Sequence, residues 1–158
     1  LEVPRDSHNF EVVLASCSLP VLFQPVKVGH HYYLDGGITD SIPYRQAMKE
    51  GCDKNIVVLT RERGYVKRTD QSVKVSAWLY QRYPKIAQAL RDRAENYNRS
   101  MEELAALERE GKVFVIAPDT TYGMSRTESD PVKLEQLYEE GYLKAKEQMV
   151  ALKNYLKA

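Results

Sequence analysis

Two apolar runs separated by a long amphipathic segment dominate the hydrophobic pattern of the chain. "NIVVLT" (55–60) and "KVFVIAP" (112–118) are rich in β-branched residues, as expected of parallel strands covered on both faces. Between them, apolar residues recur every three or four positions from Ile86 to Leu104, which predicts a long helix ended by Gly111. Strand, helix and strand in this order predict an α/β fold with a mainly parallel sheet and a right-handed crossover.

The segments on either side predict further short elements. "DSHNFEVVLASCS" has helical spacing with Ser7 as a cap, and "PVKV" and "HYYL" predict a small hairpin around Gly29. "IPYRQAMKEG" predicts a helix that begins at Pro43. A last helix is expected from the cap Asp130 onward, with an apolar face formed by Leu134, Leu137, Ala145, Met149 and Leu152.

Composition narrows the class of protein. The chain has 158 residues, the size of one ordinary domain, and its 43% hydrophobic and 28% charged residues argue against disorder. A formal net charge of +1 argues against nucleic acid as a partner. Cys17 and Cys52 form no CxxC motif, so we expect free thiols in a reducing cytoplasm. Adjacent His30 and His31 would point to opposite faces of a strand, so no metal site is predicted.

Two short stretches are candidates for chemistry. Asp35, Gly36 and Gly37 directly follow an apolar strand, and this pattern is typical of a simple turn as well as of a carboxylate that the turn presents. Arg61, Arg63, Lys67 and Arg68 follow the first buried strand, where ligands of open α/β sheets gather. This basic cluster is interpreted either as a contact for a lipid headgroup or carboxylate, or as a solvated loop.

The stretch "ASCSLPVLFQPVKVGHHYYLDGGITDSIP" resembles the patatin-like phospholipases. The resemblance rests on an Ala-Ser helix end, Pro20, the Phe23 and Pro25 pair, a short hairpin and the Asp-Gly-Gly turn. "RTESDPVKLEQLYEEGYLKA" is similar to the tail of bacterial members. The resemblance implies a three-layer α/β sandwich with a mainly parallel sheet. Residues 1–158 would form the C-terminal portion of one such domain, including a helical C-terminal extension.

The same resemblance implies a mechanism and its partners. Patatin-like enzymes are lipid acyl hydrolases in which a serine on a G-x-S-x-G elbow is activated by the Asp of the Asp-Gly-Gly turn. Asp35 matches that general base, and Gly36 and Gly37, lacking Cβ, would let the backbone turn sharply beneath it. The substrate would be a phospholipid or another acyl ester, with peripheral membrane contact allowed and neither cofactor nor metal required.

The sequence also departs from the family. It contains no G-x-S-x-G and no G-G-G-x-R-G turn, and "GMSRT" (123–127) lacks the second glycine. Both missing elements precede residue 1 in the family's order, and the chain opens at Leu1, so we expect a C-terminal fragment that is inactive alone. Its sheet would be completed by the missing N-terminal half or by a homodimer partner. The alternative is a non-catalytic, truncated α/β domain that binds a partner or serves a structural role.

Overall fold

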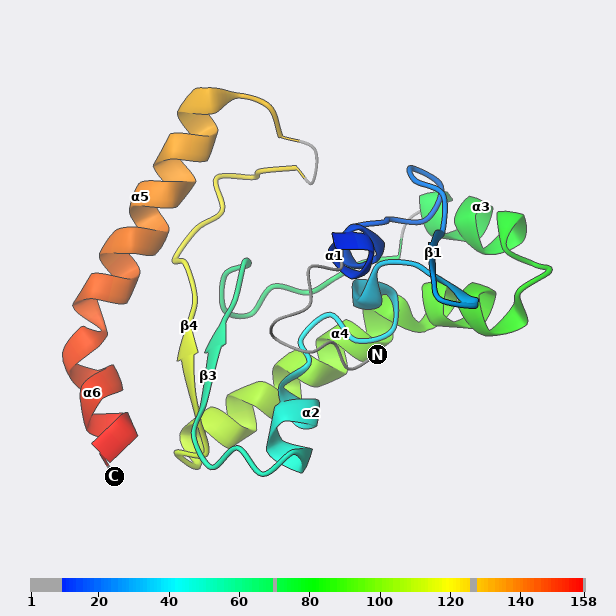
Figure 1. The fold of residues 1–158 in the computed structure, drawn as a ribbon. Coiled ribbons are helices and arrows are strands. Elements are labelled where there is room, and N and C mark those ends of the chain that lie inside the picture. Colours follow the sequence, from blue (N-terminus) through cyan, green and yellow to red (C-terminus); the bar gives the residue numbers. More distant parts are fainter. Residues whose placement is uncertain (1–9, 70, 126–127, 158) are drawn as a thin grey trace. The chain divides into compact units, whose positions relative to one another are not determined.

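The computed structural model describes residues 10–69, 71–125 and 128–157 (Figure 1). These residues group into two compact units. Unit 1 comprises the chain up to Ile42 together with Lys67–Asn98, and unit 2 comprises Pro43–Val66 and the chain from Arg99 onward. The long helix α4 (Pro84–Arg109) contributes its first part to unit 1 and its last part to unit 2.

Unit 1 begins with helix α1 (Phe10–Ser16) and a hairpin of β1 (Val26–Val28) and β2 (His31–Tyr33). The two strands are antiparallel, with Val26 opposite Tyr33. Gly29, in the connecting turn, has a φ of +61°, a conformation that favours glycine. The predicted hairpin is therefore confirmed, whereas the predicted cap Ser7 lies outside the described residues.

The core of unit 1 forms where two helices meet the segment after the hairpin. The 3-10 turn η1 (Gly36–Ile38) buries Ile38 against α3 (Gln71–Leu79) and the start of α4. The sequence did not predict α3. Val73, Val75 and Ala77 recur at every second position, which is the period of a strand, and a polar loop precedes them.

Unit 2 holds a parallel pair of strands. Helix α2 (Tyr44–Lys49) leads to β3 (Asn55–Val58), which pairs in parallel with β4 (Val113–Ile116), Asn55 lying opposite Val113. The predicted parallel pairing and the helix α4 between the strands are confirmed; Gly111, at a φ of +70°, follows that helix.

The expected burial of this sheet on both faces is wrong for the described residues. Val57, Val113 and Val115 are buried, but Ile56 and Val58 point to the other face and are exposed. The described strands make two separate two-stranded sheets. This helix-rich mixture is compatible with the α/β class, but these residues do not by themselves form a three-layer sandwich.

The C-terminal helices α5 (Pro131–Glu147) and α6 (Met149–Lys157) form an arm with no fully buried residue (Figure 1). Oδ1 of Asp130 accepts a hydrogen bond from the N–H of Val132 at 2.9 Å, so the predicted cap is confirmed. Gln148 separates the two helices. However, its N–H donates to the carbonyl of Lys144 and its carbonyl accepts from Leu152, so helical hydrogen bonding continues through the break.

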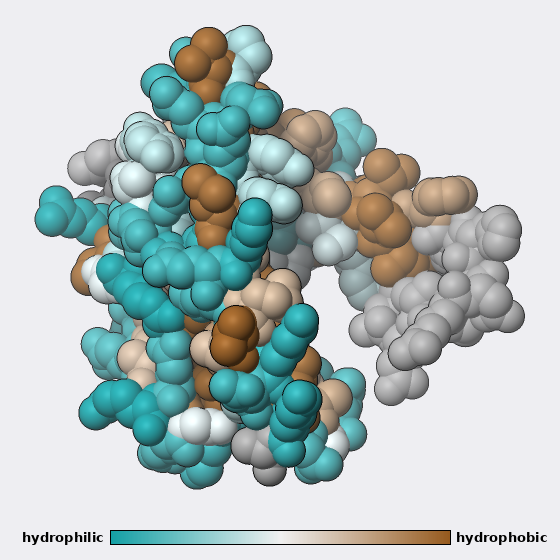
Figure 2. All heavy atoms as spheres, turned by 90° about the vertical axis from the view of Figure 1, so that its left-hand side faces the viewer, coloured by the Kyte–Doolittle hydropathy of each residue, from teal (hydrophilic) through white to brown (hydrophobic). Residues whose placement is uncertain are grey.

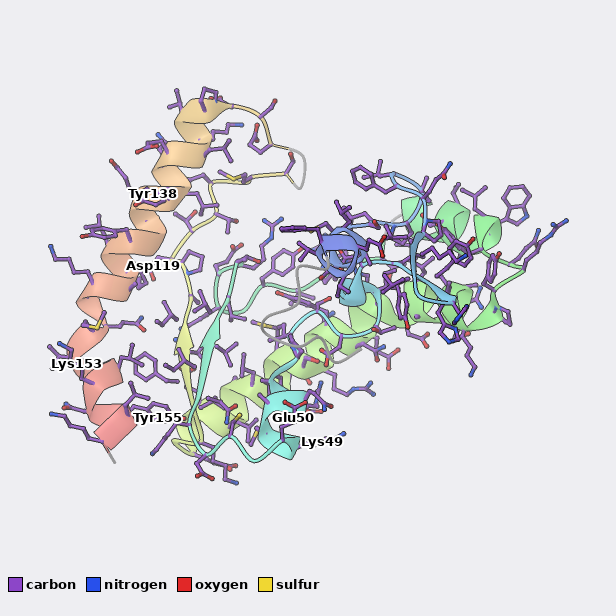
Figure 3. The ribbon with its side chains drawn as sticks, in the orientation of Figure 1. Lys49, Glu50, Asp119, Tyr138, Lys153 and Tyr155 are labelled. Atoms are coloured by element: carbon purple, nitrogen blue, oxygen red, sulfur yellow. The ribbon has the colours of Figure 1, made fainter. Side chains whose placement is uncertain are left out.

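Two anchors attach this arm to the rest of unit 2. In the last turn of α5, Lys144 pairs with Asp119 at 2.6 Å, and the carboxylate of Asp119, followed by that of Glu147, raises the pKa of Lys144. In α6, the hydroxyl of Tyr155 accepts from the N–H of Asn55 and donates to the carbonyl of Lys112, each at 3.0 Å (Figure 3). A single hydroxyl thus joins the beginnings of both strands to the last helix.

Candidate functional site

The backbone around Asp35 places its carboxylate at the end of the hairpin. Asp35 lies two residues after β2 and caps the 3-10 turn η1. Its backbone N–H donates to the carbonyl of Ser18 at 2.9 Å, which ties the position to the end of helix α1. Its side-chain Oδ1 accepts from the N–H of Gly37 at 2.7 Å. The half-buried carboxylate is therefore held in one orientation by the turn that follows it.

The two glycines contribute to this turn in different ways. Neither Gly36 nor Gly37 is among the glycines of positive φ, so the turn uses no left-handed backbone at either position. A Cβ added at Gly37 would lie 3.0 Å from Oδ1 of Asp35, whereas one at Gly36 would meet open space. Gly37 is thus required by the position of the carboxylate, because a side chain there would press on it.

Arg93, on helix α4, holds the same turn from the other side. Its Nε donates to the carbonyl of Gly37 at 2.9 Å, and that carbonyl also accepts from the hydroxyl of Ser41 at 2.8 Å. Gly37 therefore uses its N–H on Asp35 and its carbonyl on Arg93 and Ser41. Sequence reasoning missed Arg93, because no local motif marks an arginine 56 residues away as a partner of the Asp-Gly-Gly turn.

Asp40 provides an internal comparison for Asp35. Its Oδ1 accepts a hydrogen bond from the N–H of Ile42, two residues later in the chain, at 3.2 Å. Asp35 makes the same kind of hydrogen bond with Gly37. Both aspartates therefore form turns of the type that this side chain favours. The hydrogen bond from Gly37 is enough to explain an aspartate at position 35. A chemical role would therefore depend on the acceptor positions of the carboxylate that this hydrogen bond leaves open.

The carboxylate of Asp35 keeps hydrogen-bond acceptor positions that the turn does not use. A carboxylate offers about four acceptor sites, and the hydrogen bond from Gly37 occupies one of them. The serine hydroxyls nearest in sequence are engaged elsewhere, since Ser18 donates to the carbonyl of Leu14 and Ser41 to that of Gly37. The arrangement thus presents a fixed carboxylate, and no serine hydroxyl among the described residues is hydrogen-bonded to it.

Two members of the basic cluster after β3, Arg61 and Arg63, have partners within unit 2, whereas Lys67 and Arg68 belong to unit 1. Arg63 makes a two-pronged ion pair with Glu108 and also donates to the carbonyl of Val115 at 2.8 Å. Arg61 donates to Thr121 and to the carbonyl of Met124, and its guanidinium lies over the ring of Tyr65. These two arginines therefore hold neighbouring segments of unit 2 together, and a contact of the cluster with a lipid headgroup or carboxylate stays a prediction.

Glu62, between these arginines, has a shifted acidity. A hydrogen bond from its own backbone N–H and a second from the hydroxyl of Thr121, at 2.9 Å, hold the pKa of this carboxyl below its usual value. Both bonds favour the charged form, because a carboxylate accepts them and a neutral acid accepts them less well. Glu62 therefore helps to hold the loop after β3 against the segment that contains Thr121.

The described part of the chain was also surveyed for a metal centre and a membrane span. Within it, no three His, Cys, Asp or Glu side chains gather as metal ligands would. Helix lengths and hydropathies in the same residues fall short of what is needed to cross a membrane. Cys17 and Cys52 are both exposed and unpaired with each other.

Comparison with known families divides the chain in two. The model of the patatin-like phospholipase family matches residues 6–48, a short stretch that includes the whole Asp-Gly-Gly turn. The resemblance to patatin-like phospholipases is confirmed. This partial match points to a family of lipid hydrolases. A second model, described as a domain of unknown function (DUF6363), matches residues 83–157, which include β4, α5 and α6. No curated protein matches the chain significantly.

Proposed function

We propose that the chain supplies the general base of a patatin-like serine lipid acyl hydrolase, with the nucleophilic serine on a segment outside this chain. The observation that carries the proposal is the carboxylate of Asp35, fixed by Gly37 within the stretch that the patatin-like model matches. We further propose that residues 1–158 are the C-terminal portion of one three-layer α/β domain with a helical extension.

The proposed chemistry uses Asp35 twice. The serine oxygen attacks the acyl carbonyl of the ester while its proton passes to Asp35, because a hydroxyl is a poor nucleophile without a base in hydrogen-bond reach. The proton then passes to the leaving alcohol, and the acyl group stays on the serine. Asp35 next takes a proton from water, whose oxygen attacks the acyl-serine; the bond from the acyl carbon to the serine oxygen breaks, the fatty acid is released, and Asp35 returns the proton to the serine oxygen. Glycine-rich backbone donors on the missing segment would stabilise the oxyanion.

The substrate class follows from the family. A lipid ester, as a phospholipid or another acyl ester, is the expected substrate, and its hydrolysis is a step of lipid degradation. The proposed enzyme is cytoplasmic, in keeping with two cysteines that form no pair. Neither a metal nor an organic cofactor is needed for this chemistry.

A second candidate is a non-catalytic domain that binds a partner. Two observations favour it: the sequence has no G-x-S-x-G motif, and the model of unknown function covers more residues than the patatin-like one. In this alternative Asp35 is a turn former and nothing more, like Asp40.

The two candidates are separated by paired substitutions in a longer polypeptide that carries this chain behind an upstream G-x-S-x-G segment. Asp35→Asn keeps the oxygen that accepts from Gly37 but cannot take a proton, so ester turnover should fall by about 10³-fold or more. Asp40→Asn makes the same change in the same kind of turn and should leave turnover near normal. Equal activity of the two variants, both with unchanged melting temperatures, would contradict the hydrolase proposal.

A further inference from the structure

The arm formed by α5 and α6 carries an apolar stripe with the spacing of a coiled coil. Its six members follow one another at intervals of four, three, four, three and four residues: Tyr138, Tyr142, Ala145, Met149, Leu152 and Leu156. Because hydrogen bonding continues through Gln148, the stripe runs along one face of both helices. A repeat of alternating three- and four-residue steps is the signature of a seam that packs against another helix.

This stripe is largely open in the structure. Neither α5 nor α6 has a fully buried residue, and Tyr138 is 67% exposed while Tyr142 is 58% exposed. The rings of these two tyrosines stack at a centroid distance of 6.5 Å. Figure 2 looks onto this side of the arm, where apolar residues interrupt a mainly hydrophilic surface. Large apolar and aromatic side chains in a regular row cost free energy in water, so the row calls for a partner surface.

The anchors of the arm use a different face of the helices. At about 100° per residue, Lys144 and Tyr155 lie roughly a quarter turn or more from the centre of the stripe. The ion pair of Lys144 with Asp119 and the hydrogen bonds of Tyr155 can therefore persist while the stripe is covered. Figure 3 shows Tyr138 and Lys153 on the arm, with Tyr155 between the arm and the strands.

The charges beside the stripe select one kind of partner. On the side of the stripe away from the anchors, the first half of the arm carries Glu135 and Glu139, and the second half carries Lys146, Lys153 and Lys157. A second copy of the same arm, running in the opposite direction, places the acidic half of each copy along the basic half of the other. A parallel arrangement would place like charges together.

We propose that the α5–α6 stripe is the interface of a two-fold symmetric, antiparallel homodimer. In the register that pairs Tyr142 with Leu152 of the second copy, and Met149 with Ala145, Glu139 lies beside Lys153 of the second copy. The two-fold axis makes this pairing twice. Neither residue makes an ion pair with any residue that the structure describes. Lys146 faces its own copy at the axis, a like-charge contact that weakens the dimer.

The interface is tested first by its apolar seam. Sedimentation equilibrium of the 158-residue chain should show a monomer–dimer equilibrium, and Tyr142→Asp should raise its dissociation constant by about tenfold or more. The matched control is Leu143→Asp, because Leu143 is 60% exposed, like its neighbour, but lies off the stripe. This control should leave the constant unchanged. Circular dichroism of each variant verifies that the helices are retained.

The orientation is tested by charge exchange. Glu139→Lys and Lys153→Glu should each weaken the dimer, and the double variant should restore it, because the double exchange recreates both cross-pairs. Lys146→Gln should strengthen the dimer by removing the contact at the axis. Circular dichroism of each single variant verifies that it is folded.

Several results would overturn the proposal. The first is a wild-type chain that stays monomeric at every soluble concentration. The second is an equal rise of the dimer dissociation constant in Tyr142→Asp and Leu143→Asp. The third is a double charge exchange that does not restore the dissociation constant of the wild type. A longer polypeptide that stays monomeric yet protects the backbone of α5 and α6 from hydrogen exchange would assign the stripe to the rest of that polypeptide instead. None of these readouts depends on hydrolase activity, so the dimer and the proposed function fail separately.

Discussion

The backbone N–H of Gly37 donates to Oδ1 of Asp35 at 2.7 Å, and the space where a Cβ of Gly37 would stand lies 3.0 Å from the same oxygen. The residue that orients the carboxylate is thus also the residue whose missing side chain makes room for it. Real Cβ atoms rarely approach an oxygen this closely, so an alanine must displace the carboxylate by a few tenths of an ångström.

Gly37→Ala should therefore lower ester turnover in the longer, serine-bearing polypeptide by about tenfold, because small displacements of a catalytic group are costly. Gly36→Ala is the matched control, since a Cβ there meets open space and neither glycine needs a positive φ. The measurement is turnover of a p-nitrophenyl ester together with the melting temperature of each variant. Equal losses in the two variants would mean that Gly37 has no special relation to Asp35.

The 158-residue chain alone should hydrolyse p-nitrophenyl esters no faster than background. Its sequence holds the proposed base, Asp35, but no G-x-S-x-G serine, and removing the nucleophile from such a pair leaves only weak residual catalysis. The comparison is with the longer polypeptide under the same conditions. Turnover by the short chain that disappears in Asp35→Ala would refute this expectation and would require a nucleophile within these residues.

Tyr155→Phe should weaken the attachment of the C-terminal helix α6 to the strands β3 and β4 and so lower the free energy of unfolding. The change removes the hydroxyl that pairs with the N–H of Asn55 and the carbonyl of Lys112, and unpaired backbone groups cost about 1 to 2 kcal/mol of unfolding free energy. Urea denaturation followed by circular dichroism measures the loss. Tyr32→Phe, in an exposed position of β2, deletes the same atom and should change little. A Tyr155→Phe chain as stable as wild type would show that the ring contact with Phe114 suffices.

Glu62 should contribute a pH-dependent term to the stability of the loop after β3. Its pKa in the folded chain is lowered from 4.5, so folding favours the charged form. The contribution is present above the unfolded pKa and is lost as pH falls through the lower, folded pKa. Glu62→Gln, which keeps the shape, should therefore reduce stability near neutral pH, and the difference from wild type should shrink in acid. Denaturation across this pH range, with NMR titration of Glu62, provides the measurement; a difference independent of pH would contradict it.

Much of the local structure could be predicted because a few residues set element ends by their own chemistry. Gly29 fixes the hairpin turn, Asp130 caps α5, and Gly111 follows α4. The two β-branched runs likewise predict the parallel pair. The exposed face of that pair could not be predicted. Ile56 and Val58 are apolar, as buried strand residues are, but the sequence does not indicate whether another segment of this chain covers them.

The candidate site was predictable only in part, for a related reason. Asp35, Gly36 and Gly37 are adjacent, so a short motif can mark them. Arg93 acts on Gly37 from another helix, and nothing in its sequence neighbourhood distinguishes it from the other arginines of α4. Whether Asp35 is a base stays a prediction, because Asp40 makes the same turn.

The hydrogen bond between Asn55 and Tyr155 has a consequence for the order in which the chain folds. It joins residues 100 positions apart. Strand β3 therefore leaves the ribosome well before helix α6, whose Tyr155 hydroxyl accepts from the N–H of Asn55. Until β4 emerges, β3 has no partner strand among the described residues. Long-range pairings of this kind form slowly and leave strands open to wrong association. The hydrogen bonds that hold β3 are therefore completed late in synthesis, only after α6 has emerged.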